Sequence, residues 1–115
     1  YEEKTVSFDA APPGAIGLEL ALPVLWQIFV AHSAESSSRW SPMQLWQSLS
    51  AGPAQCLGLS AGQLEVGVPA ELVLFDPQIS WEVSPSNLKS LAENTPWLGQ
   101  TIQGKVSRVW YGCRD

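Results

Sequence analysis

Hydrophobic and polar positions follow two different periods along this chain. After Gly17, apolar residues recur at intervals of three and four, as on one face of a helix. They are Leu18, Ala21, Leu22, Leu25, Ile28 and Phe29, with His32 at the end of the series. Beyond Ser60 the pattern alternates instead, which is typical of strands. Helices followed by strands predict an α+β arrangement at the junction of two domains, not a repeating α/β unit.

Local signals predict where the helices begin and end. Ser41-Pro42 supplies an N-cap hydroxyl followed by proline at the first helical position. The buried edge of this second helix is expected at Met43, Trp46 and Leu49. Ala51-Gly52 is expected to end it, before a short third helix from Pro53 to Leu57. The segment before Gly14 is expected to be an extended loop.

Beyond residue 60 we expect short strands separated by turns. The glycine-bounded residues 62–67 predict one strand, and residues 70–76 predict a buried strand that stops at the following proline. Residues 79–83 alternate as a further strand, and residues 85–91 predict a short exposed helix. Residues 101–111 predict the final strand.

Composition excludes several classes of protein. The 115 residues include six Lys and Arg against eleven Asp and Glu, giving a net charge of −5 without a continuous basic stripe, so nucleic acid is not an expected partner. The longest apolar stretch, Leu20 to Ala31, is too short to cross a bilayer. Cys56 and Cys113 form no disulfide framework, which favours a reducing cytoplasm. The start at Tyr1 and a length below the roughly 250 residues of a (β/α)8 barrel predict a fragment.

Candidate chemistry is sparse. His32 is the single histidine, which excludes a three-histidine zinc site and favours a packed or capping role for this residue. The acidic pair Glu2-Glu3 is expected to be solvated. Pro12-Pro13-Gly14 fixes two φ angles and leaves the backbone uncovered at the glycine, which suits recognition of a small polar ligand by backbone N–H groups. The alternative is a rigid entry into the following helix.

Three ordered motifs resemble a known family. Residues 62–76, GQLEVGVPAELVLFD, look like the signature near the C-terminus of the amidohydrolase superfamily. Residues 11–19, APPGAIGLE, and residues 94–99, NTPWLG, together with Glu2-Glu3-Lys4 and residues 104–106, narrow the resemblance to dihydroorotase. The resemblance covers practically the whole chain.

The resemblance implies a position within a larger fold. Residues 1–59 would form the C-terminal end of the metal-dependent (β/α)8 barrel, with the substrate loop and the last helices. Residues 60–115 would form part of the accompanying small β-sandwich. Pro13 and Gly14 align with the backbone pair that contacts substrate in the family, which favours the ligand-binding interpretation of this loop. The family's zinc ligands and catalytic residues would all lie outside this segment.

The implied function is that of a zinc dihydroorotase in de novo pyrimidine biosynthesis. The intact enzyme would reversibly cyclise N-carbamoyl-L-aspartate to L-dihydroorotate, and the isolated segment would be inactive. The implied partners are the remaining N-terminal barrel and the small-molecule substrate, in the cytoplasm. The alternative is a degenerate dihydroorotase-like scaffold for aspartate transcarbamoylase. A free-standing binding module is disfavoured because the first helix is apolar over much of its surface.

Overall fold

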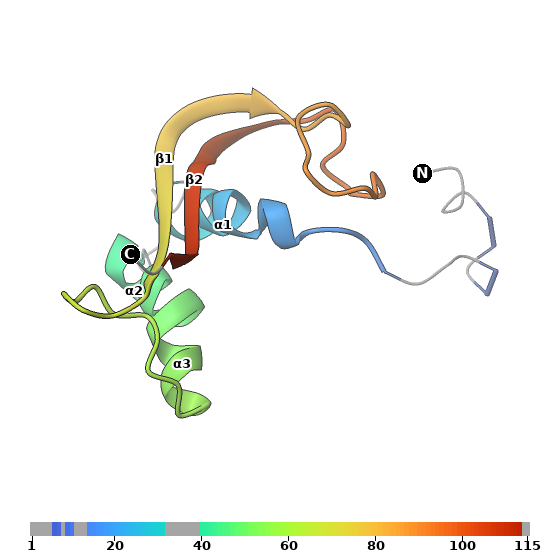
Figure 1. Cartoon of the computed structure of the whole chain (residues 1–115). Helices are drawn as coiled ribbons and strands as arrows, with labels where there is room; N and C mark the ends of the chain where they lie inside the picture. Colours follow the sequence, from blue (N-terminus) through green and yellow to red (C-terminus); the bar gives the residue numbers. More distant parts are fainter. Residues whose placement is uncertain (1–5, 8, 11–13, 32–39, 114–115) are drawn as a thin grey trace.

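The computed structural model describes residues 6–7, 9–10, 14–31 and 40–113, with only the backbone at Cys113. Helical segments occupy the first part of the described chain and a two-stranded sheet the second (Figure 1). In chain order the elements are α1 (Leu18–Trp26), η2 (Gln27–Ala31), α2 (Pro42–Trp46), η4 (Gln47–Ala51), α3 (Gly52–Cys56), β1 (Ala70–Glu82) and β2 (Thr101–Cys113), where η marks a π-helical turn. The α+β class is therefore confirmed.

Helix α1 begins where the sequence predicts. Gly17 is its N-cap and accepts a hydrogen bond from the Leu20 N–H at 3.0 Å, while Glu19 places a negative charge in the first turn, where the helix dipole favours it. Pro23 is buried inside the helix, and its carbonyl accepts from the Gln27 N–H at the start of η2. The helix therefore continues past the proline into the π-helical turn. His32 lies outside the described residues.

The second helical run is longer than predicted. Its start is confirmed, because Ser41 forms a capping box: the Gln44 N–H donates to Ser41 Oγ at 3.2 Å, and the Ser41 N–H donates to Gln44 Oε1 at 2.7 Å. The predicted end at Gly52 is wrong. Gly52 has helical angles, φ −60° and ψ −55°, so the helix runs on into α3. It ends at Gly58, whose φ is +63°.

The predicted buried edge of this helix is wrong at Met43 and Leu49, and Trp46 is the one member that packs inward. Met43 is 71% exposed and Leu49 is 42% exposed, whereas Leu45 is 1% exposed. Trp46 is half-buried, and its ring lies 6.1 Å from that of Phe75 and 6.4 Å from that of Trp26. These aromatic contacts set which face of the helix turns inward, and periodicity alone does not determine them.

Strand β1 merges two predicted strands into one. It pairs with β2 in antiparallel orientation from Ala70 to Glu82, passing Pro77 instead of stopping there. The register shifts between Asp76 and Ser80, and the Gln78 N–H in this irregular stretch donates to Asp76 Oδ1 at 2.9 Å. A register irregularity is where a strand can accommodate proline. Strand β2 confirms the predicted final strand and extends it by two residues.

Three other expectations on the strands and loops are wrong. Residues 62–67 form no strand but an irregular loop whose glycines have positive φ. Residues 85–91 form a turn instead of an exposed helix, and Leu88 within them is buried. The expected burial of residues 70–76 does not hold within this chain, since Val73 and Leu74 are 53% and 54% exposed.

The hydrophobic core lies at the loop end of the β1–β2 hairpin. Both strands bend, and α1 lies beside them (Figure 1). The core consists of Leu20, Val83, Leu88 and Ile102, with Ile16, Val24, Trp81 and Trp97 packed against it. It therefore joins the start of α1, the hairpin loop and the segment that precedes α1. Within the described ranges, no helix has the length and apolar character that crossing a membrane requires.

Candidate functional site

The candidate substrate loop approaches α1 as extended backbone. Pro13 lies outside the described residues, so only Gly14 of the predicted pair can be placed in the structure. Gly14 is exposed and has a φ of +86°, a conformation that L side chains rarely adopt. Apart from Gly14 itself and its two chain neighbours, no heavy atom of the described residues lies within 4 Å of the position that a Cβ would occupy. The side of Gly14 on which a Cβ would stand is therefore not covered by the other described residues.

One residue from the other end of the chain holds this loop. The side chain of Asn94 donates from Nδ2 to the Gly14 carbonyl at 3.3 Å. The Asn94 carbonyl accepts from the Ile16 N–H at 3.2 Å. Both contacts join residues about 80 positions apart in the sequence, so the hairpin loop and the candidate substrate loop form one unit.

The remainder of the NTPW motif ties the same loop to the core. Thr95 is 2% exposed, and its carbonyl accepts from the Leu98 N–H at 3.3 Å. Trp97 packs on the core, and its ring lies 4.0 Å from where a Cβ on Gly17 would be. The segment that leads into α1 is thus supported along its length, from Gly14 to Gly17.

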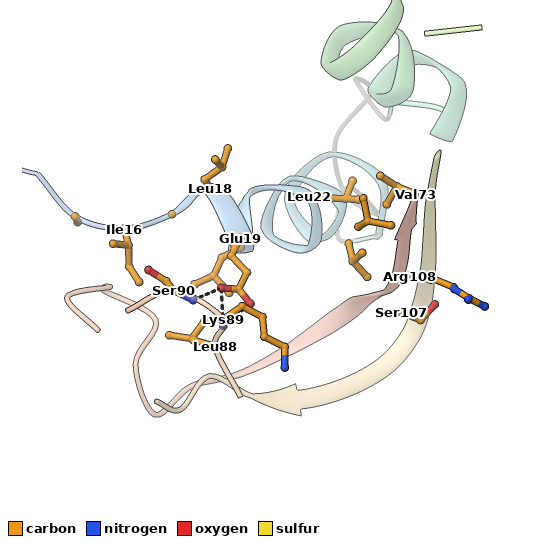
Figure 2. A pocket seen from close by; sticks show the side chains of 15 residues that line it. Ile16, Leu18, Glu19, Leu22, Val73, Leu88, Lys89, Ser90, Ser107 and Arg108 are labelled. Carbon is orange, nitrogen blue, oxygen red and sulfur yellow. Dashed lines mark hydrogen bonds between the residues drawn. The ribbon is translucent and has the colours of Figure 1, made fainter. Parts of the chain in front are cut away.

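Glu19 is engaged in a structural contact. Its carboxylate accepts from the Lys89 N–H at 3.0 Å to both oxygens and from the Ser90 N–H at 3.2 Å to Oε2. Figure 2 shows the carboxylate directed at this turn of the hairpin loop. Glu19 therefore fixes the hairpin loop against the first turn of α1.

An apolar groove of about 950 Å³ runs between α1 and the hairpin (Figure 2). Leu18 and Leu22 of the helix line it together with Val73 and Val106 of the strands, and Lys89 and Arg108 also contribute to its wall. Leu18 is 93% exposed. The apolar lining suits a packed protein surface better than a small polar ligand, which needs several convergent polar groups.

The described residues do not fit a metal ion. Among them, no group of three or more His, Cys, Asp and Glu side chains lies close enough together to hold one. His32 and the acidic pair Glu2-Glu3 lie outside the described ranges. The Cys56 thiol is free and exposed.

Sequence reasoning missed the part that Asn94 plays. It treated Asn94-Thr95-Pro96 as a turn and did not connect it with the loop at Gly14. The available signal was the joint presence of the PPG and NTPW motifs in one resemblance. Two motifs that accompany each other can do so because their residues are in contact.

Comparison with known proteins agrees with the resemblance seen in the sequence. Residues 6–112 match the model of the amidohydrolase family. The chain is 42% identical over 106 residues to a "Probable dihydroorotase-like protein" of Synechocystis sp., covering 92% of this chain and 22% of that relative. It is 38% identical over 112 residues to a "Dihydroorotase" of Anaeromyxobacter dehalogenans, covering 97% of this chain and 24% of the relative. A "Dihydroorotase" of Geobacillus thermodenitrificans is 38% identical over 102 residues, with 89% and 23% covered.

The chain spans about a quarter of the length of these curated relatives. The resemblance to dihydroorotase is confirmed, since proteins of that name match most of its length. The family match extends over nearly all of the sequence, from the segment before α1 through both strands of the hairpin. This chain belongs to the amidohydrolase family.

Proposed function

We propose that this chain is the C-terminal part of a dihydroorotase, which interconverts N-carbamoyl-L-aspartate and L-dihydroorotate in de novo pyrimidine biosynthesis. The observation that carries the proposal is the loop at Gly14, which has an open backbone and a positive φ, and in which Gly14 accepts a hydrogen bond from Asn94 and Ile16 donates one to it. The 36–42% identity to relatives named dihydroorotase or dihydroorotase-like supports this assignment of substrate.

In this proposal, Pro13 and Gly14 bind the substrate through their backbone groups. A peptide group held in a fixed orientation recognises a carboxylate or an amide edge without first having to be ordered, which lowers the entropic cost of binding. The positive φ of Gly14 keeps a side chain out of the approach. The role of this segment is to bind and orient the substrate.

We assign residues 1–59 to the end of a barrel and residues 60–115 to a small β-sandwich. The described helices all precede residue 58 and the described strands all follow residue 69, which supports this division. Zinc is the proposed metal of the parent. As the family resemblance implies, its ligands would come from the rest of the protein. The exposed free thiol of Cys56 is compatible with the proposed cytoplasmic location.

The amount of exposed surface supports a place within a larger protein. The described residues show an excess of exposed large apolar side chains, among them Leu18, Val73 and Leu74 at 93%, 53% and 54% exposed. The groove between α1 and the hairpin contributes apolar surface to this excess. We assign its cover to the remaining barrel of the same parent, without which the segment would be inactive.

The test is an activity assay on the full-length parent protein carrying Gly14→Ala. We expect dihydroorotate turnover in the wild-type parent and a KM about tenfold higher in the variant, because an alanine at a φ of +86° is strained and shifts the loop. Gly67→Ala is the matched control, since Gly67 has a φ of +92° and open space around it but lies in a different loop. Its KM should stay within about twofold of the wild-type value.

Two results would count against the proposal. Equal KM values for Gly14→Ala and the wild-type parent would remove the loop from the substrate site. A wild-type parent without bound metal and without turnover would favour the scaffold for aspartate transcarbamoylase, which a binding assay with that enzyme would then test.

A further inference from the structure

Asn94 makes two hydrogen bonds to a stretch of three residues. Its side-chain Nδ2 donates to the carbonyl of Gly14 at 3.3 Å, and its backbone carbonyl accepts from the N–H of Ile16 at 3.2 Å. Because the two hydrogen bonds hold neighbouring peptide groups, they fix both the position and the orientation of the backbone between Gly14 and Ile16. Asn94 therefore constrains both peptide units that flank Ala15.

These bonds determine where the intervening N–H points. The described chain contains no cis peptide bond, so the N–H of Ala15 is directed opposite to the carbonyl of Gly14. Because that carbonyl faces the Asn94 amide, the Ala15 N–H faces away from Asn94. Rotation of the Gly14–Ala15 peptide would break the bond from Nδ2, and glycine itself offers little steric resistance to such rotation.

Asn94 is well placed to impose this constraint because its neighbours are anchored. Thr95 is 2% exposed, and its N–H donates to the Glu93 carbonyl at 2.8 Å. Trp97 packs against the core, near Gly17. Because the backbone next to Asn94 is anchored, the Asn94 amide can hold the loop at Gly14 in place. A hydrogen-bond donor on a mobile turn would move together with the loop.

We infer that Asn94 is a positioning residue for the substrate: it holds the Gly14–Ala15 peptide in the orientation that binds the ligand. This inference rests on the proposed function, in which the loop at Gly14 contacts the substrate. Asn94 itself touches the loop and not the substrate. Its loss should therefore weaken substrate binding and leave the chemical step largely intact.

The experiment measures steady-state kinetics in both directions on the full-length parent protein carrying Asn94→Ala. This variant removes the side-chain donor and keeps the backbone carbonyl that bonds Ile16. We expect KM to rise about fivefold to tenfold, the range of one lost hydrogen bond, while kcat stays within about twofold. Asn94→Asp retains the shape but places carboxylate oxygens opposite the Gly14 carbonyl, and we expect its KM to rise at least as much.

Asn87→Ala is the matched control. Asn87 also donates from Nδ2 to a backbone carbonyl, that of Glu82 at 2.9 Å, and it lies in the same hairpin loop without a bond to the Gly14 segment. We expect KM and kcat of this variant to stay within about twofold of wild type. The thermal midpoints of all variants, measured in parallel, identify any that are unfolded at the assay temperature.

The outcomes separate this inference from the proposal beneath it. An active parent in which both folded Asn94 variants keep the wild-type KM overturns the inference and leaves the proposed function standing. A fall in kcat with unchanged KM, or an equal rise of KM in Asn87→Ala, also overturns it. A wild-type parent that does not turn over dihydroorotate overturns the proposed function, and the inference falls with it.

Discussion

The two ends of the β1–β2 hairpin have similar apolar sequences but opposite environments. At the loop end, Val83 and Ile102 are 0% and 3% exposed. At the open end, Val73 and Val109 are 53% and 61% exposed. The loop end is covered by α1 and by the loop that joins the strands. At the open end, Val73 and Val109 line part of the groove between α1 and the hairpin. The alternation of apolar and polar residues along a strand predicts which side chains share one face of the sheet. The neighbouring elements determine which part of that face is buried.

The largest expected effect contrasts one buried leucine with one exposed leucine. Leu20→Ala in the parent should lower the free energy of unfolding by about 2 to 5 kcal/mol, because Leu20 is 1% exposed within the core. Leu91→Ala is the same change at a residue that is fully exposed within this chain, and we expect less than about 0.5 kcal/mol. Urea unfolding followed by tryptophan fluorescence measures both. Similar losses in the two variants would show that the core described here does not dominate the stability of this region.

A second prediction concerns Gly104, which lies in β2 between the buried and the exposed ends of the hairpin. Gly104 lies in the register irregularity between Lys105 and Gln103, has a φ of +98° and would place a Cβ 2.6 Å from Phe75 Cζ. Gly104→Ala should cost about 1 to 3 kcal/mol of stability, from overpacking added to backbone strain. Gly67→Ala shares the positive φ without the close contact, so the difference between the two variants isolates the clash. Equal thermal midpoints would contradict the packing of Phe75 on Gly104.

The smallest expected effect tests whether the exposed end of the hairpin is covered in the parent protein. Val73→Thr should destabilise the parent by about 1 kcal/mol, because the proposed cover of the groove would bury the added hydroxyl. The same change in the isolated segment should alter stability by less than about 0.5 kcal/mol, since Val73 is exposed there. The comparison is made by thermal unfolding of both proteins. An unchanged parent would place the cover elsewhere.

Local signals predicted those parts of the fold that depend on a few adjacent residues. The start of α1 after Gly17, the capping box at Ser41 and the extent of β2 each follow from short-range chemistry. The class of the fold followed from the change of hydrophobic period, and the family from three motifs that occur in order along the chain.

The errors arise where a local signal does not decide the structure. Gly52 carries a typical stop signal, yet the helix continues through it. Pro77 could not stop β1, because a register irregularity and the bond from Gln78 to Asp76 accommodate it. Residues 62–67 have the composition of a strand but no pairing partner in the described chain. Of the candidate site, the conformation at Gly14 was foreseeable from its residue type, but the hydrogen bonds between Asn94 and this loop depend on the tertiary fold.

The separation between Gly14 and Asn94 has a consequence for the order in which this region matures. Their bond closes a loop of 80 residues, so it forms after the helices and most of the hairpin loop have been synthesised. Long-range contacts of this kind bear a loop-closure entropy that local helices do not, and they form late in folding. A nascent chain that stops before residue 94 contains every residue of the candidate loop but lacks the group that orients it. In the proposed function, the loop can therefore orient its ligand only once the chain has been synthesised beyond residue 94.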